Sequence, residues 1–153
     1  MLTRPNWQYL LAAAVLGVLQ LILGIISPFR STIVSYIVEL LILALGFVSG
    51  QHAKLTGGRP GWFASATGAL YGLIAGIAPF FVTITIADLT QQLHHQVISH
   101  ARLQQIVKMD NTPAAHFSGW LLSVVTYGLL TLIIGSIGGF VIKQKQARDR
   151  NAV

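Results

Sequence analysis

The sequence predicts an all-α integral membrane protein: a four-helix bundle, with an extra amphipathic helix outside the membrane. Of its 153 residues, 54% are hydrophobic and only 9% are charged, whereas soluble domains carry about 25% charged residues. Four apolar blocks are each close to the roughly 20 residues that a helix needs to cross a bilayer. Backbone polar groups in lipid must be satisfied within the segment, so these blocks are helices and not open sheets.

The four predicted spans belong to a single membrane domain, 1–153. A tight turn at 27–30 joins the first two helices into a hairpin, and a glycine-rich segment, 50–61, is expected to be a flexible loop before the third. Pro79 should kink the third helix or end its regular part, because proline lacks the backbone N–H. The spans are expected at about 7–26, 31–49, 62–87 and 117–142.

The longest connection, 88–116, follows the third span. Apolar residues recur in it every four positions, from Leu89 to Ala101, and Asp88 is a plausible N-cap. This pattern predicts an amphipathic helix to about Met109. It either lies on the membrane surface or extends the third helix outward, and periodicity does not choose between the two.

Positive charges orient the helices. Cytoplasmic loops of membrane proteins carry an excess of Lys and Arg, and both ends inside the cytoplasm would place seven basic residues inside and three outside. The protein is therefore expected in the cell membrane, with a cytoplasmic tail, 143–153. The formal net charge of +6 reflects this topology, so no nucleic-acid partner is expected. The inner residues would be Arg4, Lys54, Arg59, Lys143, Lys145, Arg148 and Arg150, and the outer ones Arg30, Arg102 and Lys108.

The chain also carries a faint internal repeat. Residues 21–25, followed by Pro-Phe, resemble residues 73–77, and residues 46–48 resemble 139–141. The matches would relate two parallel hairpins by an axis along the membrane normal. Apolar sequence of low complexity also produces such matches by chance.

Glu39 is the most informative single residue, because it is the only acidic residue within a predicted span. A charge near the middle of a span costs about 2.5–3.5 kcal/mol on insertion, so Glu39 should face protein or water. Gln20, Tyr127 and Thr131 are expected near the same depth and complete a predicted intramembrane polar cluster. Glu39 is either a proton- or cation-linked group or a protonated carboxyl that joins helices through hydrogen bonds.

Glycines repeat at four-residue spacing on the third and fourth helices. Such small residues allow close approach of helix backbones in lipid. They are expected to pack the helices of one chain, or alternatively to form an interface with a second copy or another membrane protein. The predicted packing residues are Gly68, Gly72, Gly76, Gly135 and Gly139.

No catalytic constellation, metal site or cofactor motif is visible, so the chain is not expected to be an enzyme. His94, His95, His100 and His116 occur near the long connection. Their spacing does not place three ligands on one helical face, and a solvated polar face explains them better than a metal or a pH sensor.

Several motifs are similar to those of a known group. The run 46–50, the pair Gly61-Trp62, the run 68–72 and the glycine-rich run 135–139 resemble small four-helix prokaryotic membrane proteins of unknown function. This resemblance implies a bacterial or archaeal envelope protein and names no activity or site residue. The long histidine-containing connection departs from that pattern.

The sequence thus favours a structural, accessory or regulatory component of a membrane complex. Its partners would be the lipid bilayer and either a second copy or another membrane protein. One alternative is a small transporter or channel subunit with Glu39 in a polar cavity. Another is a protein that binds an outer-surface partner through residues 88–116.

Overall fold

The structure, a computed structural model, describes residues 4–26, 33–92 and 98–151. Over these residues the chain is all-α, as predicted, and four helical segments are long and apolar enough to cross a membrane. By length and composition it is a multi-pass membrane protein. Its elements are α1 (Arg4–Ile26), α2 (Ile33–Leu55), α3 (Pro60–Ala75), the 3-10 helix η1 (Ala78–Phe81), α4 (Ile86–Gln92), α5 (His100–Asp110) and α6 (Pro113–Asn151).

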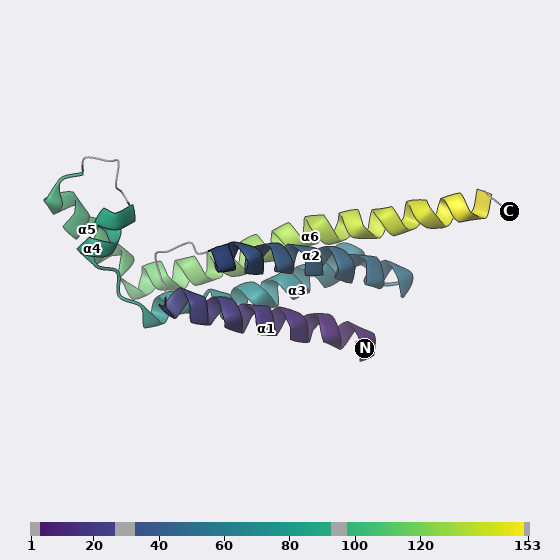
Figure 1. The fold of residues 1–153 in the computed structure, drawn as a ribbon, viewed down its shortest axis with the longest axis horizontal. Helices are drawn as coiled ribbons and strands as arrows, with labels where there is room; N and C mark the ends of the chain where they lie inside the picture. The colour runs from purple at the N-terminus through teal and green to yellow at the C-terminus, as the bar shows by residue number, and fades with distance from the viewer. Residues whose placement is uncertain (1–3, 27–32, 93–97, 152–153) are drawn as a thin grey trace.

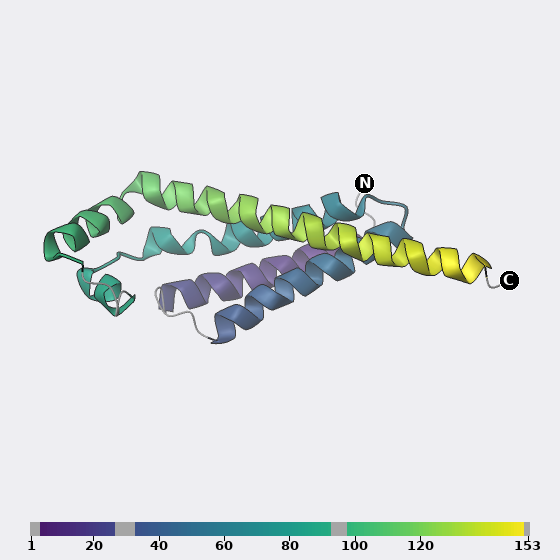
Figure 2. The same cartoon turned by 90° about the horizontal axis from the view of Figure 1, so that it is seen from above.

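The four long helices run along one axis, as two perpendicular views show (Figure 1, Figure 2). α3 packs most extensively against α6, α2 contacts both of them, and α1 lies mainly against α3. α4 and α5 sit at one end of the bundle, which we call the cap end, and residues 82–112 are the cap. The N- and C-termini and the α2–α3 connection lie toward the opposite end, the termini end (Figure 1).

Apolar side chains dominate the outer surface of the bundle. Only 11–33% of the residues in each span's most apolar stretch are buried inside the chain, and Leu40 and Val15 are among many large aliphatic residues that are exposed. A soluble monomer rarely exposes such a continuous apolar surface. A bilayer covers it without cost, so this surface fits a protein embedded in lipid.

The connection between α2 and α3 is shorter than the predicted loop, 50–61. α2 continues to Leu55, and Gly57 ends it with a positive φ of 77°. Gly58 N–H donates to the Ala53 carbonyl at 2.7 Å, and Gly57 N–H donates to that of Lys54 at 3.3 Å. This is a Schellman motif, whose left-handed residue is usually glycine. The predicted bounds of the loop were therefore too wide, and the two helices meet through a tight, hydrogen-bonded turn.

The third span ends earlier than the predicted residue 87. α3 stops at Ala75, η1 adds one tight turn, and the chain is extended at Val82 (φ −122°, ψ 132°). Pro79 has no N–H to continue the helical ladder, and the Ile77 N–H bonds the Ile74 carbonyl instead of that of Leu73. The Leu73 carbonyl accepts a bond of 3.0 Å from the Trp120 indole of α6. A side chain of α6 thus replaces the missing helical donor.

The cap contains two helices where a single amphipathic helix over 88–109 was predicted. α4 begins before Asp88, which lies in its first turn and is not the N-cap. Thr85 is the N-cap: its hydroxyl accepts from Asp88 N–H at 3.3 Å, and the Asp88 carboxylate accepts from Thr85 N–H at 2.9 Å. This reciprocal pair is a capping box. Residues 93–97, which include part of the predicted helix, lie outside the described residues.

Asn111 holds the two parts of the cap together. Its side-chain amide accepts from Ile84 N–H and donates to the Ile84 carbonyl, both at 2.8 Å, and also donates to Val107 at 2.9 Å. The Asn111 side chain therefore satisfies the backbone N–H and carbonyl of Ile84, as a neighbouring strand would. As a result, α5 folds beside α4, and the segment does not extend α3.

α6 is longer than its predicted span. It runs for 39 residues, about 58 Å at 1.5 Å per residue, against a hydrocarbon core of roughly 30 Å. It projects beyond the other helices at the termini end (Figure 1). The predicted tail, 143–153, is therefore helical up to Asn151, and Lys143, Lys145 and Arg148 are exposed on it.

Candidate functional site

The predicted polar cluster centres on a contact between α2 and α6. The Tyr127 hydroxyl donates a hydrogen bond to Oε1 of Glu39, with 3.1 Å between the oxygens. Because α2 continues to Leu55, Glu39 is not at its middle. It lies about 9 Å along the axis from Ile33 and about 24 Å from Leu55. The carboxyl thus sits in the half of α2 nearer the cap, among apolar neighbours.

Tyr71 of α3 joins this pair, although nothing in the sequence pattern singled it out. It is fully buried, and its ring meets that of Tyr127 edge-on, with 4.7 Å between centroids. Its buried hydroxyl has no partner in hydrogen-bonding geometry among the described residues. Its place beside Gly72, where α3 and α6 approach closely, is the signal that could have identified it.

Thr131 was predicted in this cluster and serves packing instead. Its hydroxyl donates to the Tyr127 carbonyl of its own helix at 2.6 Å. Its methyl carbon is 3.0 Å from where a Cβ on Gly46 would lie. The buried threonine therefore packs between α2 and α6, and the hydrogen bond to Glu39 comes from Tyr127.

Gln20 faces the interior from α1. It lies four residues after Leu16 and three before Leu23, and both leucines pack against the buried core. Its Oε1 is buried and has no hydrogen-bond partner in the part of the chain that the structure describes. Gln20 is thus a buried polar group on the side of α1 that faces Tyr71 and its neighbours.

Glu39 lines a groove of about 360 Å³ between α2 and α6. The groove opens sideways onto the outer surface of the bundle and is not an enclosed cavity. Space remains at Gly119, where an added Cβ would meet nothing within 4 Å. The lining residues are Glu39, Leu43, Gly119, Leu122, Ser123, Thr126, Tyr127 and Leu130.

The predicted packing glycines of α3 lie against α6. A Cβ on Gly72 would come within 2.6 Å of the Ser123 carbonyl oxygen, and one on Gly76 within 3.0 Å of the Ser123 Cβ. A Cβ on Gly68 would collide with Thr131 and with the Tyr127 carbonyl. These three positions are therefore occupied by contacts within the chain.

The α6 glycines are placed similarly, at the termini end. A Cβ on Gly135 would collide with Ala64, and one on Gly139 with Pro60. Among the described glycines, those of α1 and α2 make no such close contact between these two helices, which contact each other less than α3 and α6 do. The two hairpins are thus packed differently, so the faint sequence repeat is not matched by equal packing.

The histidines that the structure describes do not converge. His94 and His95 lie outside the described residues, His100 is exposed, and the His116 ring packs edge-on against Phe80 at 5.7 Å. His52 of α2 packs against Tyr9, with 5.3 Å between ring centroids. Over the described ranges, no three His, Cys, Asp or Glu side chains gather to hold a metal ion.

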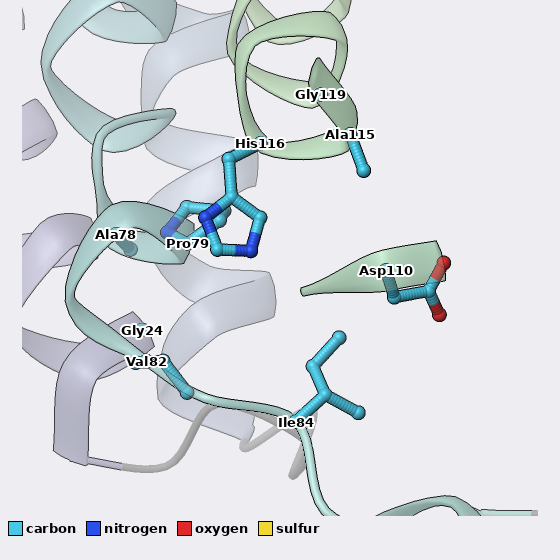
Figure 3. A pocket seen from close by; sticks show the side chains of 9 residues that line it. All are labelled: Gly24, Ala78, Pro79, Val82, Ile84, Asp110, Ala115, His116 and Gly119. Carbon is cyan, nitrogen blue, oxygen red and sulfur yellow. The ribbon is translucent and has the colours of Figure 1, made fainter. Parts of the chain in front are cut away.

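A second concavity, of about 290 Å³, lies at the cap end between α1, η1 and α6. Its lining is mainly apolar. Figure 3 shows the His116 imidazole pointing between Pro79 and Ile84, while the Asp110 carboxylate turns away from it. Gly119 borders both this pocket and the Glu39 groove.

Comparisons with known proteins do not indicate which class of membrane protein this is. No family model, curated protein or solved structure matches this chain. The resemblance to small prokaryotic membrane proteins therefore remains a prediction.

Proposed function

We propose that this chain is an accessory component of a membrane complex, and that it binds its partner through the Glu39 groove. One observation carries the proposal: a carboxyl within an apolar span lines an open groove between α2 and α6. An ionisable group facing lipid is costly. A transmembrane helix seated in the groove would cover Glu39 and remove that cost.

The placement of the glycines supports the same function. Gly68, Gly72, Gly135 and Gly139 are used in contacts between helices of this chain. They are not free to form the interface with a partner. The Glu39 groove has open space at Gly119 and contains an acidic side chain, whereas the larger groove of about 600 Å³ between α1 and α2 is lined by none.

We further propose that the protein lies in the cell membrane with both termini in the cytoplasm. Both termini and the basic α2–α3 turn lie toward one end of the bundle (Figure 1), and seven of the ten Lys and Arg residues belong to these segments. Trp7 and Trp62 are exposed at the same end, and aromatic belts form at membrane interfaces.

Site-specific photo-crosslinking in native membranes tests this function. A photoreactive residue in place of Leu43, which lines the groove, should give a discrete protein adduct. The same residue in place of Ile22, exposed on α1, should not. Gly119→Phe, which fills the groove, should abolish the Leu43 adduct. Equal crosslinking from both positions, or adducts unaffected by Gly119→Phe, would contradict the proposal.

A small transporter is the second candidate, because the cap-end pocket and the Glu39 groove both border Gly119. If they joined, they would link Glu39 to the cap end. Glu39→Gln should then abolish proton-coupled flux in reconstituted vesicles, and unchanged flux would exclude this use of Glu39. Binding of an outer partner through residues 88–116 is tested by deleting that segment, which should release the partner.

A further inference from the structure

The charge in the groove indicates what kind of helix fits it. Building on the proposed accessory function, we propose that the groove between α2 and α6 receives a transmembrane helix of another protein, and that this helix carries one lysine or arginine at the depth of Glu39. The juxtaposition of an acidic side chain with an open groove between two helices carries the inference.

The shape of the groove suits a helix. Its α6 wall consists of residues spaced by three or four positions from Gly119 to Leu130, which lie on one face of a helix. This wall is about 17 Å long at 1.5 Å per residue. At Gly119 an added Cβ would meet nothing within 4 Å, and such a small residue lets a second helix approach closely.

Among the residues that the structure describes, no lysine or arginine pairs with Glu39. Tyr127 supplies one hydrogen-bond donor to Oε1, and the Ser123 hydroxyl of the same groove donates to the Gly72 carbonyl at 3.2 Å. No lysine or arginine occurs at residues 31–53, 60–101 or 109–142. Intramembrane ionisable residues usually pair with one another or with backbone carbonyls. A basic group on the partner would complete the pairing.

A second copy of the chain does not meet this requirement. Its spans also lack lysine and arginine, so a symmetric dimer through the groove would bring two carboxyls together without a cation. Such a dimer would need at least one carboxyl to be protonated. Charge complementarity therefore favours a different protein with a basic transmembrane residue.

Synthetic helices in lipid vesicles test the proposal, whichever protein is the natural partner. The full chain, labelled with a fluorophore, is reconstituted with leucine-rich peptides of about 21 residues, enough to span a bilayer. The peptides are identical except for lysine, asparagine or leucine at the depth of Glu39. Energy transfer should show roughly tenfold tighter association for the lysine peptide than for the leucine peptide. The asparagine peptide should be clearly weaker than the lysine peptide.

Two variants assign this preference to the groove. Glu39→Gln should bind the lysine and asparagine peptides equally, whereas Glu39→Asp should retain the preference for lysine. Gly119→Phe should weaken all three peptides, because it occupies the space into which they pack. Unchanged helical content and Trp120 fluorescence would show that the substitutions at Glu39 and Gly119 leave the fold intact.

The outcomes separate this inference from the proposed function. If all three peptides bind alike and Gly119→Phe releases them, the groove binds helices but the basic partner is wrong. If asparagine equals lysine with the native chain, Glu39 acts as a protonated hydrogen-bond donor and the basic partner is again wrong. If no peptide binds, or the labelled chain associates with itself and excludes them, the inference is overturned. The crosslinking experiment then decides separately whether the groove binds any protein.

Discussion

Tyr127 and Glu39 join α6 to α2 through a hydrogen bond of 3.1 Å inside the apolar part of the bundle. The tyrosine ring is itself held by its edge-on contact with Tyr71 of α3. Side chains of α2, α3 and α6 therefore come together near one carboxyl, although the helix next to α2 in the sequence is α1. This contact positions the proposed groove and leads to the first prediction.

Tyr127→Phe should destabilise the bundle by about 0.6 kcal/mol, the average for hydrogen bonds between membrane helices, and by no more than their maximum of about 1.7 kcal/mol. The ring contact with Tyr71 is kept, so the change isolates the hydroxyl. Unfolding by SDS in mixed micelles, followed by circular dichroism, measures the difference. Tyr36→Phe is the matched control, because Tyr36 is an exposed tyrosine of α2 and should change stability far less. Equal losses in the two variants would contradict a structural role for the Tyr127 bond.

Gly72→Ala should destabilise the protein by about 1–3 kcal/mol, the usual cost of overpacking. Its Cβ would lie 2.6 Å from the Ser123 carbonyl oxygen and 2.9 Å from Val124 Cα. Both are backbone atoms of α6 and cannot move without separating the helices. The same micelle titration measures the loss.

Gly119→Ala is the control for that substitution. Its Cβ would meet nothing within 4 Å, and alanine has the higher helix propensity. Stability should be equal or slightly greater. If both alanine variants were equally stable, close contact between α3 and α6 at Gly72 would not hold the bundle together.

Much of the architecture followed from the sequence because lipid imposes simple rules. Span length and the absence of charge predict the four helices, whatever their neighbours. The depth of Glu39 and Tyr127 also placed them near each other, since depth follows from counting along a helix. What depth does not give is rotation about the helix axis. Tyr71 was therefore not predicted as part of the polar cluster. Thr131 was predicted as a member of that cluster, but it packs beside it.

Local backbone chemistry explains the errors at the element ends. Gly57 reads as a loop residue, yet its left-handed conformation makes the hydrogen-bonded turn that ends α2. Pro79 was expected to disturb the third helix, but the consequence depends on Trp120, which lies 47 residues away from the carbonyl that it satisfies. Such long-range satisfaction of backbone groups is not visible in a pattern of apolar residues.

Asn111→Ala should loosen the cap while leaving the four long helices intact. It removes three hydrogen bonds, two to Ile84 and one to Val107, and leaves the partly buried backbone groups of Ile84 without these partners. Hydrogen exchange should become at least tenfold faster at the Ile84 amide and in α5, with no change in α2 or α3. Met109→Ala, an exposed position of α5, should not have this effect. Faster exchange throughout the bundle would show instead that the cap supports the whole fold.

The cap should also respond to acid at one place, the capping box of α4. Hydrogen bonds from the Thr85 hydroxyl, and then from its backbone N–H, lower the pKa of Asp88 below its ordinary value of 3.8. Since the folded pKa is the lower one, the carboxylate stabilises α4 fully above the unfolded value near 3.8 and loses this contribution as the pH falls through the folded value.

Protection factors of the α4 amides from hydrogen exchange should therefore be constant from neutral pH to about pH 5, which is about one unit above the pKa of an unfolded Asp, and should then decline. Asp88→Asn removes the titrating group, so its α4 protection should begin lower and stay flat with pH. A decline in the native chain that begins near pH 6 would point to a titrating group other than Asp88. That result would contradict control by Asp88, because a carboxyl with a lowered pKa is already ionised throughout that range.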